Sequence, residues 1–134
     1  MSKDDIQDLL RTHGLRATPA RVAVLTFLHK QKHPVGIAKI QSAVPKSNPT
    51  TIYRMIDDFA QKNIVHAHDL GHGHNDYELA DRPHHHHLVC ESCGLIEDVD
   101  CHTGSYAAIL KRTAFRHINR HQTTYFGTCK WCAK

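Results

Sequence analysis

Apolar residues in the first half of the chain recur with the three- and four-residue spacing of amphipathic helices. Four segments show this spacing, at residues 3–13, 19–30, 36–44 and 49–61. The last of them carries a complete core stripe, made of Ile52, Met55, Ile56, Phe59 and Ala60. The second and fourth segments begin with Thr18-Pro19 and Asn48-Pro49, which match a capping residue followed by proline in the first helical position.

The pattern changes to that of short strands after residue 63. Residues 64–68 and 76–79 flank the turn sequence DLGHGHN and predict a β-hairpin. A few short helices followed by a hairpin are typical of a winged helix-turn-helix. We therefore expect this motif at residues 1–80, with a hinge at 81–83.

The remaining residues predict a second, smaller domain at 84–134. Strands are expected at residues 84–90, 95–99 and 123–128, and a helix at 103–115. The predicted fold class is therefore α+β, with the helices of the first domain preceding the strands of the second.

Length and composition limit the class of protein. The chain has 134 residues, 40% of them hydrophobic, which suits one domain or two small ones with modest cores. No apolar run approaches the roughly 20 residues needed to span a bilayer. Asp4, Asp5 and Asp8 precede any apolar stretch, unlike the start of a secretory signal. We expect a cytoplasmic protein in a reducing compartment.

Positive charge is concentrated in the first half of the chain. Residues 11–62 carry nine Lys or Arg against Asp57 and Asp58, a net charge of +7, while the whole chain carries +4. The basic half favours an anion-binding module beside a second, metal-binding one. A solvated basic face with no ligand is the alternative.

Five cysteines include two CxxC pairs, Cys90 with Cys93 and Cys129 with Cys132. In a reducing compartment such pairs indicate metal ligands rather than disulfides. Two pairs supply the four thiolates that structural Zn2+ prefers. A redox-active CxxC is the alternative, but the first pair leads into a strand-like run instead of opening a helix. The fifth, Cys101, is expected to be a partly buried thiol, with metal contact as the alternative.

The chain contains 14 histidines, four of them consecutive at residues 84–87. Side chains alternate between the two faces of a strand. His84 and His86 should therefore point to one face, and His85 and His87 to the other. The run predicts two separate half-sites for metal.

The segments HHHHLVCESCG, CKWC, GLRATPARVAVL and NPTTIYRMIDDF together resemble the ferric uptake regulator (Fur) family. The family includes iron, zinc and manganese sensors and the peroxide sensor. The resemblance covers nearly the whole chain, with the motifs in the right order. It implies a homodimeric, metal-dependent DNA-binding repressor with a winged N-terminal domain and an α/β dimerisation domain.

The resemblance also implies three metal sites. The four paired cysteines match the structural Zn2+ site: Cys90, Cys93, Cys129 and Cys132. A regulatory cation at the domain junction would be held by His33, Glu78, His85, His87 and Asp98. A second, variable site would use His84, His86 and His121, but Ser105 stands where its carboxylate is expected. Imidazoles and carboxylates without cysteine suit Fe2+, Mn2+ or Zn2+ at the regulatory site, and favour the harder cations.

The proposed regulatory cation would fix the angle between the two domains of each subunit. A homodimer could then place two recognition helices in successive major grooves, roughly 34 Å apart, of a double-stranded operator, expected to be an AT-rich inverted repeat. Arg54 and Tyr53 are the candidates for reading bases, Lys46 and Thr51 for positioning phosphates, and Arg16 for the minor groove.

Two other functions remain open from the sequence. An exposed histidine-rich site is compatible with a metal-dependent hydrolase, although no HExxH or deaminase motif is present. A metal-buffering protein is the other, and would leave the basic half without a role. The remaining histidines are expected to be surface, capping or wing-tip residues: His13, His29, His66, His68, His72, His74, His102 and His117.

Overall fold

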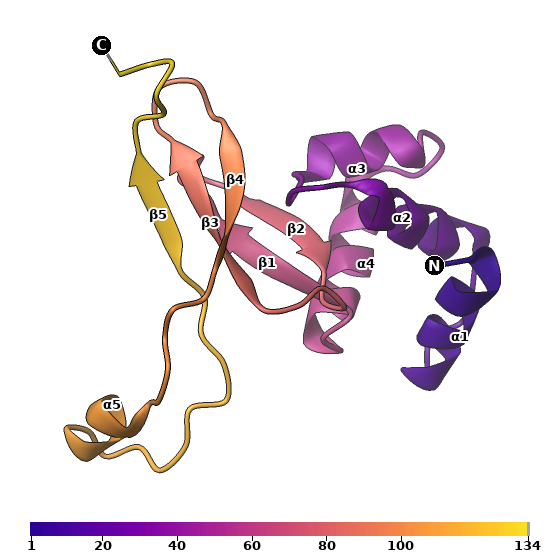
Figure 1. The fold of residues 1–134 in the computed structure, drawn as a ribbon. Helices are drawn as coiled ribbons and strands as arrows, with labels where there is room; N and C mark the ends of the chain where they lie inside the picture. Colours follow the sequence, from indigo (N-terminus) through magenta and orange to yellow (C-terminus); the bar gives the residue numbers. More distant parts are fainter. Residues whose placement is uncertain (134) are drawn as a thin grey trace. The chain divides into compact units, whose positions relative to one another are not determined.

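The computed structural model describes residues 1–133 and contains both helices and strands, so the predicted α+β class is confirmed (Figure 1). The chain divides into two compact units, Met1–Arg82 and a second that begins at Pro83. Between residues 1 and 133, no helix is both long enough and apolar enough to cross a membrane.

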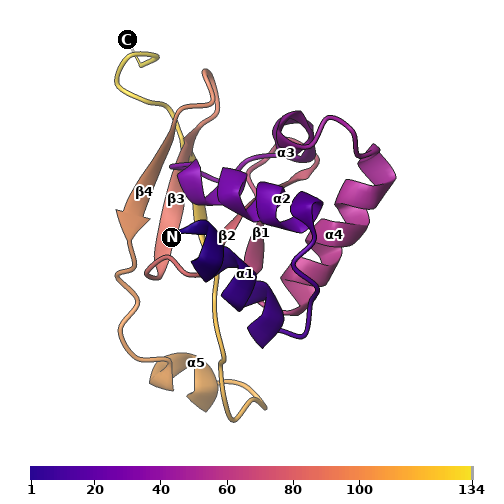
Figure 2. The same cartoon turned by 90° about the vertical axis from the view of Figure 1, so that its right-hand side faces the viewer.

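The first unit is a winged helix-turn-helix (Figure 2). Its elements are α1 (Lys3–Thr12), α2 (Pro19–Lys30), α3 (Ile37–Ala43), α4 (Pro49–Gln61), β1 (Val65–Asp69) and β2 (Asn75–Leu79). The starts of α2 and α4 are set by their caps, as predicted. Thr18 Oγ1 accepts a hydrogen bond from the Arg21 amide at 3.3 Å, and Asn48 Oδ1 accepts one from the Thr51 amide at 2.8 Å.

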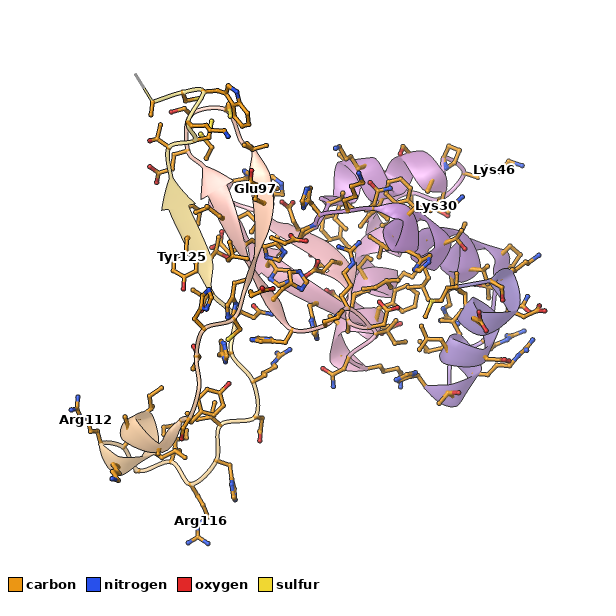
Figure 3. The ribbon with its side chains drawn as sticks, viewed as in Figure 1. Lys30, Lys46, Glu97, Arg112, Arg116 and Tyr125 are labelled. Atoms are coloured by element: carbon orange, nitrogen blue, oxygen red, sulfur yellow. The ribbon has the colours of Figure 1, made fainter. Side chains whose placement is uncertain are left out.

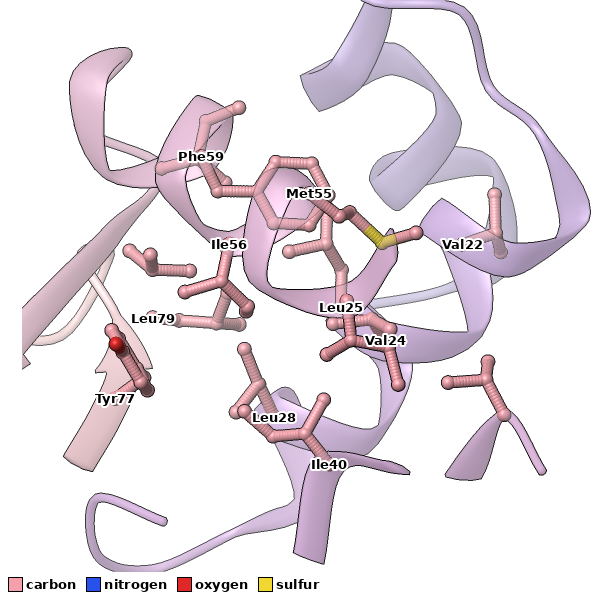
Figure 4. Packing of buried hydrophobic residues seen from close by; sticks show 14 of the residues in the cluster. Val22, Val24, Leu25, Leu28, Ile40, Met55, Ile56, Phe59, Tyr77 and Leu79 are labelled. Atoms are coloured by element: carbon pink, nitrogen blue, oxygen red, sulfur yellow. The ribbon is translucent and has the colours of Figure 1, made fainter. Parts of the chain in front are cut away.

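A single apolar core holds this unit together, with α4 at its centre. Ile52, Ile56 and Phe59 are fully buried and Met55 nearly so, as the stripe predicts. They pack among side chains of α2, α3 and β2 (Figure 4). All members of this buried cluster lie between residues 6 and 79, so the core belongs to the first unit alone.

The wing is the antiparallel β1–β2 hairpin. Val35 extends it, because the amide and carbonyl of Val35 exchange hydrogen bonds of 2.9 and 2.8 Å with those of Tyr77. This pairing joins the segment that leads into α3 to the sheet. The hairpin turn needs a left-handed backbone at Gly71 and Gly73, with φ of 89° and 83°.

The second unit is a three-stranded sheet with a long connection. It contains β3 (His85–Cys90), β4 (Ile96–Asp100), α5 (Ala107–Lys111) and β5 (Thr124–Gly127), in the sheet order β4-β3-β5. β3 pairs with β4 in antiparallel fashion and with β5 in parallel. The parallel pair requires the chain to cross over between β4 and β5, and we call residues 101–123 the crossover segment.

The predicted helix at 103–115 is wrong in its extent, because only Ala107–Lys111 is helical. Thr103, Gly104 and Ser105 are poor helix formers. No residue of α5 is buried, and Ile109 is 52% exposed. A short helix without a packed apolar face gains little from tertiary contacts, so it does not extend.

The second unit lacks an apolar core of its own. Among residues 83–133, Val89 and Cys90 are the apolar side chains that are fully buried. A unit of this size with so little buried apolar surface needs another source of stability, such as a metal ion or a partner subunit.

We expect Ile56→Ala to destabilise the first unit by about 2–5 kcal/mol, because it leaves a cavity at the centre of the core. Urea denaturation followed by far-ultraviolet circular dichroism measures this loss, since four of the five helices described in residues 1–133 lie in this unit. Gln61→Ala, at an exposed position of the same helix, should change the free energy of unfolding by less than about 0.5 kcal/mol. Equal effects of the two substitutions would contradict the assignment of the core.

Candidate metal centres and nucleic-acid interface

Four cysteine sulfurs converge at one end of the second unit. Cys90 ends β3, and the parallel pairing of Cys90 with Gly127 on β5 brings the second CxxC turn beside the first. All four sulfurs lie within 4.8 Å of one another, and those of Cys93 and Cys129 are 3.8 Å apart. Ligands about 2.3 Å from a tetrahedral Zn2+ are separated by about 3.8 Å. The cysteines therefore fit one such ion.

The thiols of this cluster differ in acidity. The Cys129 amide donates to Cys90 Sγ at 3.3 Å, and this hydrogen bond, helped by that of the Cys93 amide, lowers the pKa of Cys90 to about 6. Hydrogen bonds with the Cys129 and Cys93 side chains raise the pKa of Cys132 to about 12, because they favour its protonated form. Cation binding must therefore displace protons from part of the cluster.

The geometry disfavours the redox alternative for these pairs. Cys93 lies in the turn before β4, and Cys129 lies after β5, so neither pair opens a helix. All five cysteines are free thiols.

His85, His87 and Asp98 form a second cluster, across β3 and β4. His87 pairs with Asp98 in the strand register. The Nε2 atoms of His85 and His87 are 3.1 Å apart, and His87 Nε2 is 3.7 Å from Asp98 Oδ1. Two nitrogens about 2.1 Å from one octahedral cation are separated by about 3.0 Å. His85 Nδ1 lies 2.7 Å from the Pro83 carbonyl and donates to it, and this hydrogen bond orients the ring with Nε2 toward His87.

The other two predicted regulatory ligands lie in the first unit. His33 follows α2, and Glu78 lies on β2 with its side chain buried. Glu78 Oε1 is 2.8 Å from His68 Nε2, and Glu78 Oε2 is 3.6 Å from the Arg82 guanidinium.

His68 was expected to be an ordinary surface residue, and this expectation is wrong. Its ring is 7% exposed and pairs with the buried Glu78 carboxylate. The hairpin register places His66 opposite Glu78 and His68 on the diagonal, and diagonal neighbours are within reach of long side chains. The register of the predicted hairpin was the signal that could have found this pair.

His84, His86 and His121 also come together, on the opposite side of β3 from His85 and His87. The Nε2 atom of His121 lies 3.0 Å from Nε2 of both His84 and His86. Cys101 joins them, with its sulfur 3.2 Å from His121 Nε2. Ser105 is absent from this cluster, since its hydroxyl accepts a hydrogen bond from the Ala107 amide.

His86 differs from its neighbours in this cluster. Burial, together with the nearby charge of His84, lowers its pKa, so the neutral ring that binds metal is favoured. The Thr123 amide donates to His86 Nδ1 at 3.2 Å. Coordination through Nε2 would place the ring proton on Nδ1 and lose this hydrogen bond, at a cost of about 1 kcal/mol.

The predicted DNA-binding residues lie on exposed parts of the first unit. Thr51, Tyr53 and Arg54 are on the face of α4 that points away from the core, and Tyr53 is 49% exposed. Lys46 projects from the turn between α3 and α4 (Figure 3). Arg16 is exposed in the segment before α2. None of the five contributes to the apolar core.

A model of the ferric uptake regulator family matches residues 12–124. Ferric uptake regulation protein 2 of Mycolicibacterium fortuitum is 30% identical over 136 residues, which cover 96% of this chain and 93% of that protein. The ferric uptake regulation protein of Legionella pneumophila is 29% identical over 130 residues, covering 92% and 95%. The chain belongs to the ferric uptake regulator family.

Solved structures of Fur-family proteins share the fold. The Helicobacter pylori regulator, described as having three functional metal binding sites, superposes with a TM-score of 0.77 at 20% identity, covering 100% of this chain and 95% of that one. A zinc uptake regulator in complex with zinc and DNA superposes with a TM-score of 0.63 at 22% identity, covering 97% of this chain and 91% of that one. The predicted family is confirmed, and with it the prediction of a metal-responsive transcriptional regulator.

We expect Cys93→Ser to abolish retention of zinc at the four-cysteine cluster, because three thiolates leave the site open. Elemental analysis after dialysis should show one zinc ion fewer per chain. Hydrogen exchange should show lost protection in β3 and β5, which the cluster ties together. Ser92→Ala, which changes the exposed neighbour inside the same turn, is the control and should retain both the zinc ion and the protection of β3 and β5. Full zinc retention by Cys93→Ser would contradict the assignment.

Proposed function

We propose that this Fur-family chain is a homodimeric repressor whose affinity for its operator is controlled by a divalent cation. The cation would be held by His33 and Glu78 of the first unit and by His85, His87 and Asp98 of the second. The observation that carries the proposal is the convergence of His85 Nε2, His87 Nε2 and an Asp98 oxygen within 4.8 Å of one another.

The ligand atoms favour Fe2+ or Mn2+ at this site, with Zn2+ at the four cysteines. The set combines two imidazoles and a carboxylate of the second unit with the His33 imidazole and the Glu78 carboxylate of the first. Nitrogen and oxygen ligands without sulfur suit these cations at five- or six-coordination. The bound cation supplies positive charge and a coordination geometry that ligands from both units satisfy together.

Control of DNA binding by the cation, which we call the gate, would follow from sharing these ligands between the two units. Residues of both units that bind one cation restrict the angle between them, and only part of the accessible range suits two successive major grooves. The cation then shifts the population toward the DNA-binding arrangement by its greater affinity for that arrangement.

The basic first half of the chain would contact the DNA. Arg54 and Tyr53 would contact base edges in the major groove, and Lys46 and Thr51 would contact phosphates. Arg16 would reach the minor groove of an AT-rich inverted repeat. Because the partner is chromosomal DNA, the proposal places the protein in the cytoplasm.

Exposed apolar side chains on the second unit support a homodimer. Leu88 on β3 and Tyr125 on β5 are neighbours in the sheet register, and they are 39% and 51% exposed. Phe126 is 47% exposed. Exposed apolar groups on a unit with almost no buried core are typical of an interface between subunits. A two-fold dimer would match the symmetry of an inverted repeat.

The gate is tested with operator duplexes selected from a random pool by the Mn2+-loaded protein. Mn2+ should raise the affinity of the wild type for the selected duplex by about 5- to 150-fold, the range of typical coupling between two sites. His85→Ala should remove this dependence. His102→Ala, an exposed histidine of the same unit, should retain it. The same affinity with and without Mn2+ in all three proteins would show that no gate exists.

Base reading and phosphate contact are separable by substitution. Arg54→Ala should lower the binding free energy for the selected duplex by about 1–3 kcal/mol and relax the sequence preference of the protein. Lys46→Ala should weaken binding to all duplexes alike and reduce the slope of log K against log salt concentration by about one. Fluorescence anisotropy at several salt concentrations measures both effects. The assignment fails if Arg54→Ala weakens selected and unrelated duplexes by the same factor.

A further inference from the structure

Cys101 lies beside three histidines and has no role in the four-cysteine cluster or in the proposed gate. Its sulfur is 3.2 Å from His121 Nε2, and one ligand atom each from His84, His86, Cys101 and His121 lies within 4.8 Å of the other three. We propose that Cys101 is a metal ligand, and that these four residues form a thiolate-containing site that fastens the two ends of the crossover segment. The proposal does not require the DNA gate.

The position of the ligands in the chain gives the site its structural role. Cys101 directly follows β4, and His121 lies three residues before β5. His84 directly precedes β3 and His86 is its second residue, and β3 lies between these two strands in the sheet. A cation held by all four would join both ends of the crossover segment to the central strand.

The crossover segment has few other contacts to hold it. None of its residues is fully buried, and its helix, α5, has no buried side chain. Arg112 and Arg116, beyond α5, project into solvent (Figure 3). A metal clip at the base of a long connection removes conformational freedom that the apolar contacts of this segment do not remove.

Tyr106 supports His121 as a ligand from inside the crossover segment. The Tyr106 hydroxyl hydrogen-bonds to His121 Nδ1. Histidines that bind metal through one nitrogen commonly use the other to hydrogen-bond a neighbouring group, which fixes the orientation of the ring. His121 therefore presents Nε2 to the cluster, where the other three ligand atoms lie.

The chemistry of the four ligands favours a different cation from that at the proposed gate. Three imidazoles and one thiolate, with no carboxylate in the cluster, suit tetrahedral Zn2+ or Co2+ better than Mn2+. Cys101 loses its thiol proton to solvent as it binds, so the occupied site contains one thiolate whose negative charge partly offsets that of the cation. The sulfur thus compensates for the carboxylate that Ser105 does not provide.

Cobalt provides a direct probe of the sulfur ligand. Full-length protein carrying one Zn2+ in the four-cysteine cluster is titrated with Co2+, and its zinc content is measured afterwards to exclude exchange. We expect a thiolate-to-Co2+ charge-transfer band in the near ultraviolet, because the proposed gate has no sulfur and only Cys101 remains available. The band should be lost in Cys101→Ser and retained in Ser105→Ala, the matched control.

A second measurement uses the unaltered chain, in case Cys101→Ser does not fold. Zn2+ added to protein whose four-cysteine cluster is already filled should block alkylation of Cys101 by iodoacetamide, measured by peptide mass mapping. It should also slow hydrogen exchange across the crossover segment. The proposal is overturned if the charge-transfer band is absent from the wild type, if it persists in Cys101→Ser, or if added Zn2+ leaves the alkylation rate of Cys101 unchanged.

Discussion

The parallel pairing of β3 with β5 is the constraint on which the second unit depends. It places Cys90 opposite Gly127 and so brings two CxxC turns, far apart in the sequence, to within the reach of one ion. The same pairing brings the end of the crossover segment, with His121, beside the start of β3. Both sulfur-containing clusters therefore depend on this pairing, and the second also requires the antiparallel pairing of β3 with β4, which positions Cys101.

The two units are stabilised by different means. The first has a closed apolar core centred on α4, and its stability should not depend on metal. The second has only Val89 and Cys90 as fully buried apolar side chains among its described residues, and exposes Leu88, Tyr125 and Phe126. Metal ligation and subunit contact would supply the stabilisation that its small apolar core does not provide, since a ligand that binds only the folded state stabilises that state. A regulator built in this way links the integrity of its metal-binding half to the supply of metal.

Local signals made the first unit predictable from its sequence. Asn48-Pro49 fixes the start of α4, and the apolar stripe that follows fixes which face is buried. Strand alternation likewise separated His84 and His86 from His85 and His87, as the structure shows. These features depend on residues a few positions apart.

What escaped prediction depends on contacts between distant residues. The contact of Cys101 with His121 requires the crossover segment to return to the sheet, and the pair formed by His68 and Glu78 requires the hairpin register.

Calorimetric titration of Mn2+ with and without the selected duplex tests the proposed gate most directly, because coupling between two binding sites is reciprocal. Metal gating predicts that the duplex tightens Mn2+ binding by the same factor by which Mn2+ tightens duplex binding. Mn2+ affinity that is unchanged by a bound duplex would contradict it.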